Sequence, residues 1–330
     1  MAVIWTVGLA MPAPARAEGG PEKVTIGIYV NDIQEISLAS NSFTADFYLW
    51  LRWRDPKIDP SLSIGAMNST ARDNSTSSST GGVTGKPLYD APLDMPDGSK
   101  YQVLRFQGVF SKEYNLERYP FDVQNLLLVF EDEQMDFDRL QFVPDATPVT
   151  VNGDVSIPGY VVGKPRMEVF VNKYPTNFGD ISTPGNSVYS QVVVTIPMTR
   201  EVLSYLVKLM LPIIIIVLIT SLIYILPARL EDARAGIGVT AMLTIVALQW
   251  TTDDSLPSVE YLTMLDLIYI LAMLYILIAM SYTVMASRRN LHDAAEALVT
   301  QLDRRVGIAA LALYVFLTAA TMIFYVQHFR

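Results

Sequence analysis

The sequence contains no cysteine, and its two histidines, His292 and His328, lie near the end of the 330 residues. Disulfide bonds and thiolate chemistry are therefore excluded, as are histidine-based catalysis and most zinc sites in the first half of the chain. Catalysis by a pair of carboxylates remains, but no pair of acidic residues has a spacing that argues for it. We therefore expect no enzyme, no cofactor and no metal centre.

Charged residues are also scarce, at 17% of the chain, whereas 51% of the residues are hydrophobic and concentrate in the second half. Four apolar runs lie at residues 204–226, 235–251, 262–286 and 306–326. Each is close to the roughly 20 residues that a membrane-spanning helix requires. Arginines follow the third run and acidic residues precede it, which predicts a cytoplasmic connector at about residues 287–305 and an amino-terminal domain outside the membrane.

Residues 1–17 form an apolar stretch that ends in Ala15-Arg16-Ala17 and is followed by polar residues. The small-x-small ending predicts a signal peptide, and a buried core helix is the alternative. We then expect an extracellular or periplasmic ligand-binding domain over residues 18–199. A transmembrane domain should occupy residues 200–330, in the plasma membrane, or the inner membrane of a bacterium.

The outer domain has the pattern of an immunoglobulin-like β-sandwich. Short apolar or alternating runs are separated by turn residues, which predicts an antiparallel sandwich. The clearest strands are VTIGIYV, FYLWLRW, YQVLRFQGVF, NLLLVFE, RMEVFV and SVYSQVVVTI. Residues 61–85 are a polar, low-complexity segment that predicts a mobile loop.

One segment, KEYNLERYPFDVQNL at residues 112–126, places an aromatic-Pro-aromatic-Asp cluster in strand-rich sequence. Proline lacks the N–H that a strand interior requires, so this cluster predicts a shaped turn. Trp53-Arg54-Asp55 precedes it, Arg200 lies twelve residues before Pro212, and Leu256-Pro257 follows the second apolar run. This ordered set, spanning about residues 24–330, resembles the pentameric ligand-gated ion channels of the Cys-loop receptor superfamily. The two loop cysteines are absent, as in prokaryotic members.

The resemblance implies a homopentamer in which this turn couples the binding domain to the pore. Tyr119 and Phe121, held by Pro120, would press into the outer ends of the helices, and Asp122 would pair with Arg200. A plain structural turn is the alternative. The predicted coupling residues are Tyr119, Pro120, Phe121, Asp122, Arg200, Leu256 and Pro257.

The second apolar run carries a stripe at helical spacing that is mostly small or polar. Its members are Asp232, Gly236, Thr240, Leu243, Ala247, Trp250 and Asp254. Such a stripe must either pack in a bundle or line a water-filled pore, and five copies around an axis would do the second.

Rings of Asp232 and Asp254 should concentrate cations, so we expect a pore permeable to monovalent cations. The run from Arg234 to Thr240 is instead similar to the anion-selective glycine receptors, although Asp232-Ala233 replaces their Pro-Ala. An anion channel of the same fold is therefore the first alternative. A membrane-anchored binding or sensor protein that conducts no ions is the second.

By the same resemblance, an agonist would bind between subunits. The matched residues are Tyr48, Glu131, Glu133, Tyr174 and Tyr189. Aromatic rings beside carboxylates suit an amine through cation–π attraction. Protons or a divalent cation acting on the acidic residues 131–138 are alternatives, as is an ordinary solvated loop. The lipid bilayer is an expected partner and nucleic acid is not.

Overall fold

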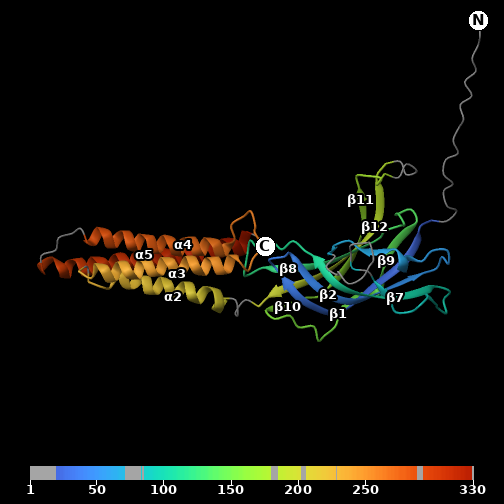
Figure 1. The fold of residues 1–330 in the computed structure, drawn as a ribbon, viewed down its shortest axis with the longest axis horizontal. Helices are drawn as coiled ribbons and strands as arrows, with labels where there is room; N and C mark the ends of the chain where they lie inside the picture. The colour runs from blue at the N-terminus through green and yellow to red at the C-terminus, as the bar shows by residue number, and fades with distance from the viewer. Residues whose placement is uncertain are drawn as a thin grey trace, which may run out of the picture.

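A computed structural model describes residues 20–70, 83, 85–179, 185–201, 206–227, 229–287 and 293–328. The predicted signal peptide lies outside these residues, and so do residues 288–292 of the predicted cytoplasmic connector, whose remaining part belongs to the ends of two helices. Figure 1 shows a β-domain and a helical bundle placed end to end along the long axis of the chain. The end of α4 and the start of α5 lie at the far end of the bundle, away from the β-domain.

The described strands form two sheets. The first has the order β4-β7-β2-β1-β9, with β5 and β6 also paired to β7, and the second has the order β10-β12-β8-β3, with β11 paired to β12. The bounds are β1 Glu22–Ser37, β2 Ser42–Trp53, β3 Ile64–Ala66, β4 Ser69–Thr70, β5 Lys86–Pro87, β6 Leu93–Asp94, β7 Lys100–Ser111, β8 Val123–Asp132, β9 Leu140–Val151, β10 Tyr160–Val162, β11 Arg166–Tyr174 and β12 Ser187–Arg200.

The core of the β-domain lies between the two sheets. Alternating side chains of β2, β7 and β8 point inward, which buries an aromatic cluster at their centre. The ring of Phe47 stacks on Phe106 with centroids 5.3 Å apart, and both rings meet Phe130 edge-on at 5.7 Å. Aromatic pairs of this geometry stabilise a core beyond their buried area. The predicted β-sandwich is confirmed, and all six predicted strands are present.

Two predictions for this domain are wrong in part. Strand β9 was not predicted, and it pairs with β1 in parallel, so the sandwich is not purely antiparallel. Its Pro144 and Pro148 are tolerated because β9 is an edge strand.

Residues 61–70 also form structure in place of the predicted mobile loop. They include the 3-10 helix η1 (Pro60–Leu62), β3 and β4. Asn68 holds this segment, since its Nδ2 donates to the carbonyls of Ser111 (3.0 Å) and Leu127 (2.7 Å) and its Oδ1 accepts from Val129 N (3.0 Å). Residues 71–82 and 84 of the predicted loop lie outside the described residues.

The second half is helical. A π-helical turn, η2 (Leu206–Met210), leads into α2 (Leu211–Ser221) and η3 (Leu222–Tyr224), followed by α3 (Glu231–Asp253), α4 (Met264–Ser287) and α5 (Asp293–His328). Within the described residues, four helical segments are long and apolar enough to cross a membrane: Val207–Tyr224, Glu231–Asp253, Met264–Ser287 and Gln301–Gln327. They coincide with the four predicted runs, which confirms the predicted four-helix domain.

Candidate functional site: pore helix, domain junction and ligand region

The domain junction is built around a buried ion pair. Asp122 precedes β8 and Arg200 ends β12, and both side chains are almost completely buried. Arg200 Nε lies 2.8 Å from Asp122 Oδ1 and Nη2 lies 3.0 Å from Oδ2, a two-pronged contact that matches the guanidinium fork. The pairing predicted for these residues is present. Its role in gating stays a prediction.

Two tyrosines enclose the arginine of this pair. The guanidinium carbon of Arg200 lies 4.8 Å from the ring centroids of both Tyr119 and Tyr160. Tyr119, predicted as part of a tip that presses on the helices, is buried against Arg200. Pro120 is also buried and Phe121 half-buried.

Backbone hydrogen bonds that sequence reasoning missed attach this turn to the bundle. The carbonyl of Glu117 accepts from Met264 N at 3.0 Å, where α4 begins. Leu116 N donates to the hydroxyl of Tyr261 at 2.9 Å, in the linker between α3 and α4. The turn is therefore bonded directly to the segment that follows α3, the predicted pore helix.

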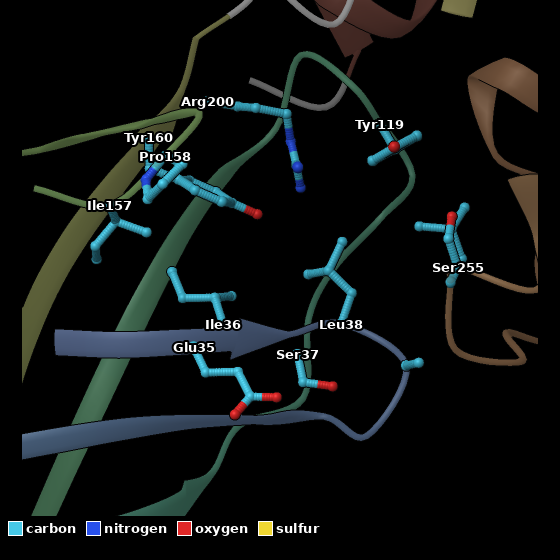
Figure 2. A pocket seen from close by; sticks show the side chains of 12 residues that line it. Glu35, Ile36, Ser37, Leu38, Tyr119, Ile157, Pro158, Tyr160, Arg200 and Ser255 are labelled. Atoms are coloured by element: carbon cyan, nitrogen blue, oxygen red, sulfur yellow. The ribbon is translucent and has the colours of Figure 1, made fainter.

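A cavity of about 550 Å³ lies at this junction. It is lined by the end of β1 and the start of the turn that follows it, from Glu35 to Ala39, by Tyr119, Tyr160 and Arg200, and by Ser255 and Leu256 of the α3–α4 linker. Figure 2 shows Arg200 between Tyr160 and Tyr119, extending toward Ile36 and Leu38. The structure thus brings Leu256 to the same cavity as the predicted turn, while the neighbouring Pro257 is half-buried.

The seven predicted pore residues all belong to one exposed surface of α3 and its carboxyl end. Leu243 and Trp250 are the most exposed large side chains among them, at 68% and 75%. The opposite face is buried and includes Gly238, Ala241, Ile245 and Thr252. A Cβ at Gly238 would lie 2.5 Å from Met280 Cγ, so α3 packs closely on α4 along its other face.

Arg234 does not share the exposed surface. It is turned into the bundle, where its Nη2 contacts Asp303 Oδ2 of α5 at 2.6 Å and also the carbonyl of Leu226. The hydroxyl of Tyr282 on α4 donates to Asp303 Oδ1 at 2.5 Å. Sequence reasoning missed Asp303 and Tyr282. The available signal was an aspartate at the edge of the last apolar run, where an unpaired charge is costly.

In the ligand region, Glu131 is buried and accepts hydrogen bonds from Asn172 Nδ2 (2.7 Å), Gln191 Nε2 (2.6 Å) and Tyr174 Oη (2.9 Å). The ring of Tyr174 meets Tyr189 at 5.9 Å. Burial, followed by the hydrogen bond to Glu131, raises the pKa of Tyr174 to about 12, so its hydroxyl stays a neutral donor. The structure therefore groups three of the five predicted residues.

The other two predicted ligand residues are placed differently. Glu133 is exposed and lies over Gly65, where a Cβ would come 2.1 Å from its Oε1. Tyr48 belongs to β2 in the other sheet, and its ring lies 5.7 Å from the guanidinium of Arg105. That guanidinium forms a two-pronged pair with Asp46, at 2.9 and 2.6 Å.

The acidic segment at residues 131–138 is structured by its own hydrogen bonds. Asp132 is buried and accepts from Ser63 Oγ (2.6 Å), Gln134 N (3.0 Å) and Met135 N (2.7 Å), and burial raises its pKa. Among the described residues, no group of three or more acidic or histidine side chains could hold a metal ion. The divalent-cation alternative therefore has no assembled site in the described chain.

A cavity of about 820 Å³ separates this acidic segment from the β11–β12 hairpin. Its walls include Asp136, Arg139, Lys173, Phe178 and Tyr189. The ring of Tyr174, which is not among the lining residues, meets Phe178 at 5.4 Å. The predicted aromatic residues thus border a space of the size that small ligands occupy.

The described chain thus combines a β-sandwich, a buried junction and four helices that are long and apolar enough to span a membrane. No family model matches the chain. It is 26% identical over 74% of its length to pH-sensitive chloride channel 2 of Anopheles gambiae, and 23% identical over 78% to the Drosophila melanogaster channel of that name. It is 21% identical over 79% to the human gamma-aminobutyric acid receptor subunit rho-3. These matches cover 42%, 51% and 57% of the relatives, so the chain spans about half their length.

The comparisons confirm the resemblance to ligand-gated channels of the Cys-loop receptor superfamily. With its four spanning helices, the chain is a multi-pass membrane protein.

The prediction of a cation-permeable pore is wrong, because the relatives whose names specify an ion are chloride channels. The prediction rested on rings of Asp232, which is exposed in the first turn of α3, and of Asp254, which is exposed just after the end of this helix. Solvent and salt screen an exposed carboxylate, and the positive end of the helix dipole opposes the charge of Asp232.

Proposed function

We propose that the chain is one subunit of a homopentameric, anion-permeable channel that opens when an extracellular ligand or a change in pH acts on its β-domain. The observation that carries this proposal is the exposed surface of α3. It combines small and polar residues with Leu243 and Trp250, in a helix long enough to span the membrane. Five such surfaces around an axis would enclose a water-filled path with an apolar constriction.

Chloride permeability is supported by the relatives and by the charges at the start of α3. The amino-terminal turn of a helix presents unpaired N–H groups and a partial positive charge of about half a unit. In a pentamer, five such helix ends would surround the inner mouth of the pore. Gly236, which follows in the stripe, has no side chain to narrow the path for a large anion.

Ligand recognition would use the aromatic side chains around the 820 Å³ cavity, with Tyr48 of a neighbouring subunit on the other side. Glu131 would not contact the ligand directly, because three donors already occupy its carboxylate. It would instead orient the ring of Tyr174 through the hydrogen bond from the Tyr174 hydroxyl. The junction would pass the response through Arg200, the turn at Tyr119 and the α3–α4 linker to the pore helix. An amine is the ligand class that aromatic rings over a carboxylate suit best.

The test of this proposal is a reversal potential measured on the purified protein in planar bilayers, with a sodium chloride gradient across the membrane. We expect a potential close to the equilibrium potential of chloride. A potential that follows sodium would overturn anion selectivity, and the absence of any current under ligands and acidic pH would favour a membrane-anchored sensor.

The pore face can be tested separately because the chain has no native cysteine. Single cysteines at Thr240 and Leu243 should react with aqueous thiol reagents and reduce the current. A cysteine at Ile245, on the buried face, is the matched control and should not respond. Equal reaction at all three positions would contradict the assignment of the pore face.

A further inference from the structure

Three helices meet at the inner end of the bundle in one buried polar cluster. Arg234 lies in the first turn of α3, Asp303 on α5 and Tyr282 on α4. The side chains of Arg234 and Asp303 are 1% and 2% exposed, and they contact each other at 2.6 Å. The pore helix is thus attached by its first turn to a helix that contributes nothing to the predicted pore surface.

The cluster balances one positive charge against one negative charge. An arginine side chain does not lose its proton in a protein, so Arg234 carries a full charge whether or not it is paired. Among the described residues, its Nε and Nη1 are buried without a hydrogen-bond partner, which leaves the contact to Asp303 as its charge-compensating interaction. In a low-dielectric surrounding, a buried charge acts over a longer distance than an exposed one.

We propose that Asp303 is a positioning residue for ion selectivity. It holds Arg234 away from the conduction path and cancels its charge, which limits the attraction of the inner mouth for anions. This inference rests on the proposed channel function, with the first turn of α3 at the inner mouth. It assigns to α5 a part in selectivity although this helix does not line the pore.

The experiment compares chloride-to-sodium permeability ratios, from reversal potentials, for Asp303→Asn, Arg234→Gln and the double variant. Asp303→Asn leaves the charge of Arg234 uncompensated, so the ratio should rise by about threefold or more. Arg234→Gln should change the ratio less, because a buried carboxyl group left alone can take up a proton. The double variant should return to within about twofold of the wild-type ratio, since both charges are gone.

Tyr282→Phe is the matched control. It removes the hydroxyl that donates to Asp303 and loosens the same three-helix contact, but it changes no charge. A purely structural role predicts that all the variants lower the amount of channel at the membrane and leave the permeability ratio alone. The proposal predicts an unchanged ratio for Tyr282→Phe and a raised ratio for Asp303→Asn.

Two results would overturn the inference: a wild-type ratio in conducting Asp303→Asn channels, or an equal rise when Arg234 is also replaced. If Asp303→Asn does not assemble, Asp303→Ser leaves room for water beside Arg234 and should raise the ratio in the same direction; an unchanged ratio there would also overturn it. The inference and the proposed function fail separately. A wild-type potential that follows sodium rejects anion selectivity, whereas the inference depends only on the shift between variant and wild type.

Discussion

The domain junction and the inner end of the helix bundle each contain a buried arginine–aspartate pair, but the two pairs are built differently. At the junction, Arg200 meets Asp122 through two nitrogens and lies between two tyrosine rings. At the inner end, Arg234 meets Asp303 through one nitrogen, and two of its other nitrogens are buried without partners within the described chain.

This difference teaches what each pair can do. A buried charge whose hydrogen-bonding groups are satisfied is held in one geometry, whereas a buried charge with unused donors is tolerated at a cost. The junction pair is therefore suited to transmit force between two domains as a rigid joint. The inner pair is suited to control the net charge near the first turn of α3, because a single contact with Asp303 compensates the charge of Arg234.

The largest expected effect comes from breaking the junction pair. Asp122→Ala leaves Arg200 buried without its carboxylate, and the loss of one partner of a buried pair costs about 3–5 kcal/mol. We expect a strongly lowered thermal midpoint of the detergent-solubilised channel and loss of gated current. Arg105→Gln is the control, because it breaks the pair with Asp46 at a half-exposed arginine and should cost about 1 kcal/mol or less. Equal losses from the two variants would contradict the special status of the junction.

A second, smaller effect should separate the two arginines directly. Lysine keeps the charge but lacks the fork and the flat surface that stacks on rings. Arg200→Lys should therefore cost about 1–3 kcal/mol, through one lost charge-assisted hydrogen bond and weaker contact with Tyr119 and Tyr160. Arg234→Lys should cost less, since a single nitrogen makes its contact with Asp303. Thermal midpoints of the two variants, measured side by side, check this order, and the reverse order would refute the comparison.

The junction pair was predictable from the sequence and the inner pair was not. Asp122 lies in a turn marked by Pro120, and the resemblance supplied Arg200 as its partner. Asp303 and Arg234 are 69 positions apart. Their meeting depends on how α5 is rotated against α3, and an apolar run without a polar stripe does not define that rotation. The same limit kept Tyr282 out of the prediction.

The strands, like the two ion pairs, differ in how far the sequence alone predicts them. Alternation of apolar residues predicted β2, β7 and β8 because one face of each is buried in the sandwich. Strand β9 escaped because its prolines are typical of turns, and only its place at the edge of a sheet allows them. In the ligand region, Glu131, Tyr174 and Tyr189 were predicted from the sequence. The hydrogen bonds that Asn172 and Gln191 donate to the carboxylate of Glu131 were not predicted. Those contacts arise from strand register, which composition does not encode.

The smallest effect concerns Asp132, a buried carboxylate whose hydrogen-bond donors are all neutral groups. Burial raises its pKa, whereas the hydrogen bond from Arg105 lowers the pKa of Asp46. The folded state therefore binds a proton at Asp132 more tightly than the unfolded chain does. The resulting stabilisation is complete below the unfolded pKa and is lost as the pH rises through the folded pKa.

Asp132→Asn mimics the protonated carboxyl group, and its Oδ1 can still accept from Gln134 and Met135. We expect a slightly higher thermal midpoint at neutral pH and a flatter dependence of stability on pH above the ordinary pKa of an aspartate. Asp138→Asn, at an exposed position, is the control and should leave the pH profile unchanged. If the pH dependence of stability were the same in Asp132→Asn as in the wild type, the neutral donors around Asp132 would stabilise its carboxylate as well as Arg105 stabilises that of Asp46. The contrast between paired and unpaired charges would then not extend to the outer domain.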